Sequence, residues 1–143
     1  MTTLTLTDGS TATARLDLTD LSPGHRQTQK ITVTFAGSAP ATIALYAPDA
    51  ADTPLARRLR VSIFEHAGAL MPFPVFQGTL ADLTTHTSYD TGFGRWTGRT
   101  QRTVDYEVMA HLPAEAPAPT GTHAEITLTA EARPLGAPLE AAA

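Results

Sequence analysis

The stretch Thr3-Leu4-Thr5-Leu6-Thr7 decides the fold class, because its leucines and threonines alternate with a period of two. That period places the leucines on one face of a β-strand and the threonines on the other. Threonine is common throughout the chain and favours strands. The next three residues, 8–10, read Asp-Gly-Ser and are typical of a tight turn. The chain therefore opens as a half-buried strand followed by a turn.

The same alternation recurs further along the chain. It predicts strands over 11–18, 29–36, 41–46, 59–63, 74–78, 102–112 and 123–132. A helical turn is expected over 55–58, a short helix capped by Thr79 over 80–84, and a loop over 85–99. About eight strands with one or two short helices predict an all-β domain, a jelly-roll-type β-sandwich. The domain is expected to span residues 1–132, with a flexible Pro- and Ala-rich tail at 133–143.

Composition excludes several classes of protein. The 143 residues carry a net charge of −4, so no basic face for nucleic acid is expected. The chain has no cysteine, which excludes a disulfide framework, a zinc ribbon and a thiol nucleophile. No apolar run approaches the roughly 20 residues that a membrane span needs.

A search for catalytic or metal-binding patterns finds none that is specific. No two of the five histidines have the spacing of a helical zinc motif. Ser22 and His25 lie in one predicted turn and lack the geometry of a catalytic triad. Asp49 and Asp52 supply too few oxygens for calcium and are interpreted as a solvated loop. The sequence therefore predicts no catalytic residue, no metal and no cofactor, and the chain is interpreted as not an enzyme.

Residues 92–99 form the most distinctive stretch. Glycines alternate there with Phe93, Arg95 and Trp96, and Tyr89 lies just before them. Such a loop can stack a sugar or another planar ligand on its aromatic rings. The competing interpretation, which we favour, is that Trp96 folds back onto the core, because tryptophan is highly buried on average.

Three segments, in this order, resemble the TasA/camelysin family of exported bacterial proteins of cell surfaces and biofilm matrices. They are the opening strand 3–6, the turn Leu21-Ser22-Pro23-Gly24, and the run Gly78-Thr79-Leu80-Ala81-Asp82-Leu83. The resemblance covers roughly residues 3–132. Residues 119–121 and 96–98 depart from the family pattern, and no zinc-peptidase motif is present, so peptidase activity is not carried over.

This resemblance implies a structural subunit of extracellular surface or biofilm-matrix fibres. It implies assembly by donor-strand exchange with other copies and with a related minor subunit. Thr3, Leu4, Thr5, Leu6 and Thr7 are the expected assembly edge strand. Because the family places an export signal and a donor segment before this strand, we expect both to have been removed here. The expected location is extracellular or at the cell surface.

Two other functions remain open on the sequence. The first is a decoration or tail protein of a phage virion, since such proteins are also β-rich. The second is a carbohydrate-binding module that uses the loop of Phe93, Arg95 and Trp96.

Overall fold

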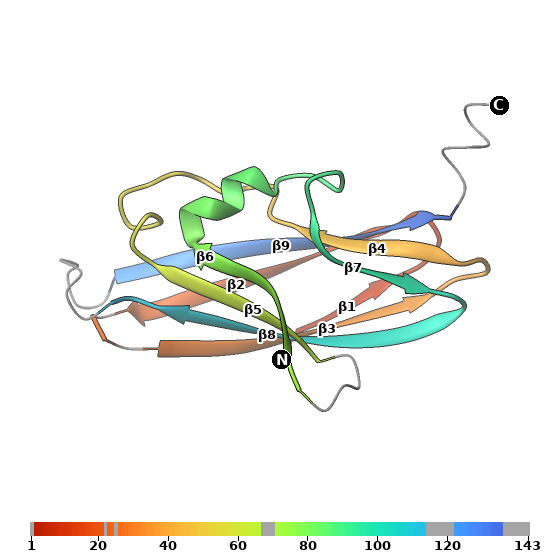
Figure 1. Ribbon diagram of the computed structural model, residues 1–143, viewed down its shortest axis with the longest axis horizontal. Helices are drawn as coiled ribbons and strands as arrows, with labels where there is room; N and C mark the ends of the chain where they lie inside the picture. Colours follow the sequence, from red (N-terminus) through yellow and green to blue (C-terminus); the bar gives the residue numbers. More distant parts are fainter. Residues whose placement is uncertain (1, 22, 25, 67–70, 114–121, 136–143) are drawn as a thin grey trace.

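The computed structural model describes residues 2–21, 23–24, 26–66, 71–113 and 122–135. Within these ranges nine strands and one 3₁₀ helix follow one another along the chain (Figure 1). They are β1 Thr2–Leu6, β2 Thr11–Leu21, β3 Arg26–Ala36, β4 Ala41–Tyr46, β5 Arg60–His66, β6 Phe73–Thr79, η1 Leu80–Thr85, β7 Phe93–Gly98, β8 Gln101–His111 and β9 Thr122–Pro134.

The strands form two packed sheets (Figure 1). The five-stranded sheet has the order β1-β3-β8-β5-β6, and the four-stranded sheet has the order β2-β9-β4-β7. We call them sheet A and sheet B. Strands β2 to β5 pair in turn with β9, β8, β7 and β6, always antiparallel. This rolled-up pairing is a jelly roll, and it confirms the predicted fold class.

The core lies between the two sheets and is filled by one face of each strand. Leu16, Val33, Ile63, Val108 and Ile126 are at most 2% exposed. Each belongs to an alternating run, so the period-two pattern identified the buried face of these strands. The described residues leave no buried side-chain nitrogen or oxygen without a hydrogen-bond partner.

Strand β1 lies at the edge of sheet A, and its expected role in assembly stays a prediction. It pairs only with β3, in parallel, with Leu4 opposite Val33. Leu4 and Leu6 are buried, whereas Thr3 and Thr5 are exposed. Thr7 lies just beyond the strand, and its N–H donates to Ser10 Oγ at 2.7 Å.

The short helix begins where the sequence predicts. Thr79 caps η1 with its hydroxyl, which accepts from the N–H of Asp82, while the Asp82 carboxylate accepts from the N–H of Thr79. This reciprocal capping box satisfies two backbone donors. A Cβ at Gly78 would lie 2.6 Å from Asp82 Oδ2, so this turn requires glycine before the cap.

Several boundaries differ from the prediction. β2 ends at Leu21 instead of residue 18, and β3 begins at Arg26 instead of residue 29. The loop expected over 85–99 is wrong in part, because Phe93–Gly98 forms β7 and pairs with β4. Gly94 adopts a φ of 62°, which only glycine tolerates easily, and such a residue breaks the regular strand pattern. β9 continues to Pro134, beyond the predicted end of the domain at residue 132. Residues 136–143 of the expected tail lie outside the described residues.

Candidate functional site

The first half of β9 lacks a partner strand on one side. On its β2 side, β9 is paired from Glu131 back to Thr122. On its β4 side, pairing runs only from Pro134 to Thr129, which lies opposite Tyr46. At Ala47 the chain turns away, and its N–H donates to the His86 carbonyl at 2.7 Å. Residues 124–128 of β9 therefore expose one backbone edge to the space that a longer β4 would fill.

The alternation of backbone groups shows which residues face this gap. The N–H of Ala132 donates to Ser10 at 3.0 Å, on the β2 side. Because neighbouring residues of a strand point their N–H and C=O to opposite sides, Thr127 and Glu125 face the gap. Within the described part of the chain, no backbone hydrogen bond to either residue is found on that side.

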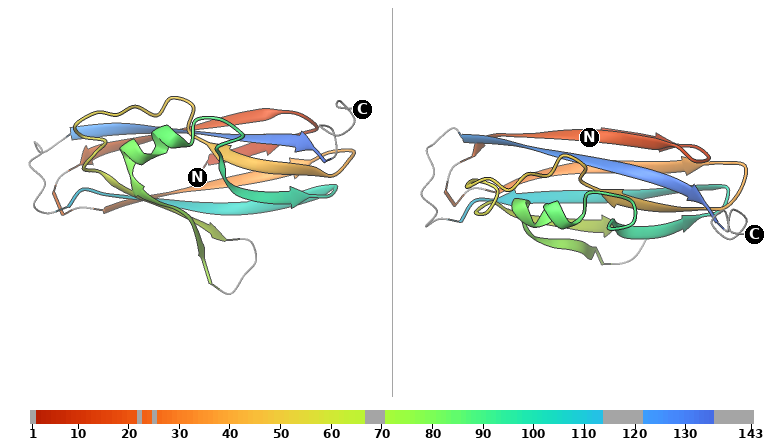
Figure 2. Two further views of the ribbon diagram at one scale, coloured as in Figure 1. Left: turned by 45° about the horizontal axis from the view of Figure 1, so that its top comes forward. Right: turned by 90° about the horizontal axis from the view of Figure 1, so that it is seen from above.

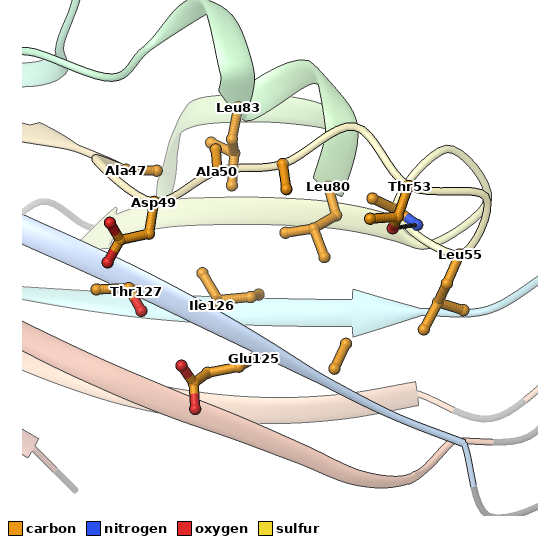
Figure 3. A pocket seen from close by; sticks show the side chains of 13 residues that line it. Ala47, Asp49, Ala50, Thr53, Leu55, Leu80, Leu83, Glu125, Ile126 and Thr127 are labelled. Carbon is orange, nitrogen blue, oxygen red and sulfur yellow. Dashed lines mark hydrogen bonds between the residues drawn. The ribbon is translucent and has the colours of Figure 1, made fainter.

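A groove of about 240 Å³ runs along this edge (Figure 3). Its floor is Ala124 and Ile126 of β9, and its walls carry Ala50, Leu55 and Leu80. Figure 3 shows Leu80 pointing from η1 toward β9. Two backbone bonds hold the wall: the N–H of Leu80 donates to Leu59 at 2.8 Å, and that of Ala81 donates to Ala56 at 2.9 Å.

The chemistry of this groove suits a peptide strand. Its apolar residues can bury side chains of an incoming segment, and the edge of Thr127 and Glu125 can bond its backbone. Asp49 and Glu125 lie at the polar side of the groove in Figure 3, and the Glu125 carboxylate is 3.4 Å from Arg15. In the described ranges, no group of three or more metal-ligating side chains is found.

The structure does not offer Phe93 and Trp96 to a ligand. They are 8% and 6% exposed, because both side chains point into the core from β7. The Trp96 indole N–H donates to the Tyr106 hydroxyl at 2.7 Å. Burial raises the pKa of Tyr106, which keeps this hydroxyl protonated. The favoured interpretation of Trp96 as a core residue is confirmed. The rings of Phe93 and Trp96 are therefore not available to stack against a sugar.

Arg95 and Tyr89 do lie at the surface, on the outer face of sheet B. The guanidinium of Arg95 lies 4.6 Å from the centre of the Tyr89 ring, and that of Arg133 lies 3.9 Å from it. Arg133 also pairs with Glu131 at 2.6 Å and with Asp90 at 3.7 Å. These cation–π and ionic contacts fix Tyr89 over β4 and β9.

The paired half of β9 carries a hydrogen bond of its own to β4. The Tyr46 hydroxyl donates to Glu131 Oε1 at 2.8 Å. Burial, together with this carboxylate, raises the pKa of Tyr46 to about 12. The phenol is therefore held in its neutral form, which is the form that can donate this hydrogen bond.

The remaining candidates from the sequence have structural roles. Asp52 forms a two-pronged pair with Arg57, with distances of 2.6 and 3.1 Å, and this contact lowers the pKa of its carboxyl. His86 stacks edge-on against Phe76 and Phe93. Ser22 and His25 lie outside the described residues.

Comparisons with known proteins identify no family. No family model matches the chain, and no curated protein matches it. Among solved structures, a periplasmic inhibitor of g-type lysozyme from Aeromonas hydrophila is 11% identical over 92% of this chain and 97% of its own, with a TM-score of 0.35. An antigen and type I fimbria protein from Burkholderia pseudomallei is 12% identical over 86% and 99%, with a TM-score of 0.43. A particle protein of infectious bursal virus is 9% identical over 89% and 31%, with a TM-score of 0.39.

At identities of 9–12% and TM-scores of 0.35–0.43, none of these three structures assigns a function to this chain. No helix in the described residues has the length and apolar character to cross a membrane. The half-open strand β9 and its groove are the features of this structure that suit the binding of another chain.

Proposed function

We propose that this chain is a non-enzymatic structural subunit of an extracellular surface or matrix fibre, assembled by donor-strand exchange. The observation that carries the proposal is the unpaired edge of β9 over residues 124–128, which lies in an apolar groove. A strand whose backbone is paired along only part of one side can accept a strand from another chain along the unpaired part.

The geometry defines what the donor must do. It runs antiparallel to β9, in line with β4, and exchanges backbone hydrogen bonds with Thr127 and Glu125. Every second side chain of the donor enters the groove between Ile126 and Leu80. An alternating apolar segment of a neighbouring copy meets both requirements.

The contact that results is heterologous, because it joins the groove of one copy to a different surface of the next. Such a contact propagates into an open filament unless its rotation closes a ring. Strand β1 supplies a second edge for the same assembly, since only one of its sides is paired. We include two further points in this proposal: the chain is related to the TasA/camelysin family, and it is located at the cell surface.

Electron microscopy of the protein purified from its source, with any natural N-terminal extension, tests the proposal. We expect fibres from the natural protein. We expect monomers from Thr127→Pro, because proline removes the backbone donor that faces the groove. The matched control is Glu125→Gln, which changes a side chain and keeps the backbone edge, so its fibres should persist.

Other outcomes would overturn the proposal. Fibres of Thr127→Pro with the same length and number as the natural protein would show that β9 is not the acceptor. Recovery of the chain in purified virions, with no fibres, would favour the virion function instead.

A further inference from the structure

Three basic side chains stand in a row across the outer face of sheet A. Arg26 of β3 lies directly opposite His111 of β8, and His111 lies directly opposite Arg60 of β5. These three strands are neighbours in the sheet (Figure 1). Adjacent strands are about 4.8 Å apart, so the row spans roughly 10 Å.

Five of the chain's other arginines have acidic, carbonyl or aromatic partners. Arg15, Arg57 and Arg133 pair with carboxylates. Arg95 and Arg102 donate to backbone carbonyls and lie over aromatic rings. In the described residues, Arg26 and Arg60 have neither a carboxylate nor a ring beside them.

This arrangement has an energetic consequence. Arg26 and Arg60 lie on either side of His111, and neither guanidinium has an acidic partner among the described residues. The chain has a net charge of −4, so acidic residues are in excess. Two arginines without acidic partners, at one end of a hollow in an acidic protein, favour the binding of an anion there.

The row forms one end of a hollow with a mixed lining. The hollow measures about 260 Å³ and is completed by Ser62, Phe64 and Met109. These three side chains are half-buried on the same outer face. Glu107 lies opposite both Phe64 and Lys30, just beyond the residues that line the hollow, so the surface past its far end has a mixed charge. An anionic group is therefore favoured at the Arg26–Arg60 end only.

We propose that this hollow binds an acidic sugar, with its carboxylate on the guanidinium groups and its ring on Phe64. A guanidinium bonds a carboxylate through two parallel N–H donors, which gives direction as well as charge. Phe64 and Met109 offer an apolar surface to the C–H face of a sugar ring. Ser62 can bond a sugar hydroxyl. A nucleic acid fits less well, because the acidic remainder of the surface repels its phosphates.

This site is separate from the groove along β9, which belongs to sheet B. It also differs from the loop that the sequence suggested for sugar binding, since Trp96 is buried. The inference does not depend on fibre formation and can be tested on the monomer.

The test is a titration followed by amide chemical shifts, with three probes. They are trigalacturonic acid, a neutral trisaccharide of the same length, and sodium phosphate. We expect trigalacturonic acid to shift amides of β3, β5 and β8 around Arg26, Arg60 and His111. We expect Arg26→Gln and Arg60→Gln each to weaken its binding about tenfold, because each removes a charge-assisted pair. Lys30→Gln, on the same face, is the matched control and should change affinity less than twofold.

Several results would overturn the proposal. These are equal affinity for the neutral trisaccharide, phosphate alone reproducing the affinity and the shifts, shifts that map to another face, or no shifts at all. Because the wild-type shift map locates the site by itself, the conclusion does not rely on the variants remaining folded.

Discussion

The two halves of β9 share one strand but differ in what their backbone touches. From Thr129 to Pro134, β9 is paired on both sides, with β2 and with β4. From residue 124 to 128 it is paired with β2 alone. Both halves bury their inward side chains equally well, since Ile126 and Leu128 of the half-open part are each 1% exposed and Ala130 and Ala132 of the paired part are each 0% exposed. The difference shows that a strand can belong fully to the core and still offer a free edge.

The first prediction concerns how tightly the half-open part of β9 is packed into the core. Ile126→Ala and Leu128→Ala should each lower the free energy of unfolding by about 3 kcal/mol, because each leaves a cavity in the core. Urea denaturation measures both. A loss below about 1 kcal/mol at Ile126 would show that the half-open part is only loosely packed.

The second prediction separates the two halves by their backbone. Thr129→Pro should cost about 3 kcal/mol, because it removes a hydrogen bond to β4 and the side-chain bond to Thr13, which measures 2.9 Å. Thr127→Pro should cost less than about 1 kcal/mol, because its N–H has no partner to lose. Equal losses in thermal melts of the two variants would mean that the edge at Thr127 is already paired.

The third prediction uses pH to weaken the paired half alone. Because the pKa of Tyr46 is raised to about 12 in the folded state, its stabilising effect is complete below the ordinary value near 10. It is lost as pH rises from about 10 to about 12. Tyr46→Phe should cost about 1 kcal/mol at pH 7 and flatten this part of the stability curve.

Stability measured by urea at closely spaced alkaline pH values tests this directly. Tyr106 titrates in the same direction, so the difference between wild type and Tyr46→Phe is the quantity to compare. An unchanged alkaline slope in the variant would contradict the role of the bond to Glu131.

The smallest effect is expected at the surface of the half-open part. The Arg15–Glu125 pair is exposed on both sides, and its N–O distance is 3.4 Å. Glu125→Gln should change stability by less than about 0.5 kcal/mol, because water and salt screen such pairs. A larger loss would mean that the side chain of Glu125, and not only its backbone, holds this half in place.

The sequence predicted most of the architecture because period-two alternation is a local property. It identified the buried leucines of β1 and the capping threonine of η1 without any knowledge of the partner strands. It missed β7 because Gly94 and Gly98 read as loop residues, and because Phe93 and Trp96, which supply its buried face, are three residues apart. A spacing of three would place these aromatics on opposite faces of a regular strand, and only the irregular backbone at Gly94, with its positive φ, brings both into the core.

The two candidate sites were beyond sequence reasoning for a different reason. The gap beside β9 exists because β4 ends at Tyr46 while its partner runs on, and nothing local says that these two strands pair. Arg26, Arg60 and His111 come from three distant segments, and only the register of β3, β8 and β5 aligns them. Properties that depend on register require the structure.

The nested strand pairing of the jelly roll also predicts the order in which the strands pair during folding. The β5–β6 hairpin, which projects from the body in Figure 2, joins the only nested pair that is close along the chain. The pairs β4–β7, β3–β8 and β2–β9 close progressively longer loops, and Thr11 must finally meet Glu131. Because loop closure costs entropy and slows folding, the β5–β6 hairpin is expected to form first. The pairs β4–β7, β3–β8 and β2–β9 are expected to follow in that order. During synthesis, β2 cannot pair with β9 until nearly the whole chain has been made.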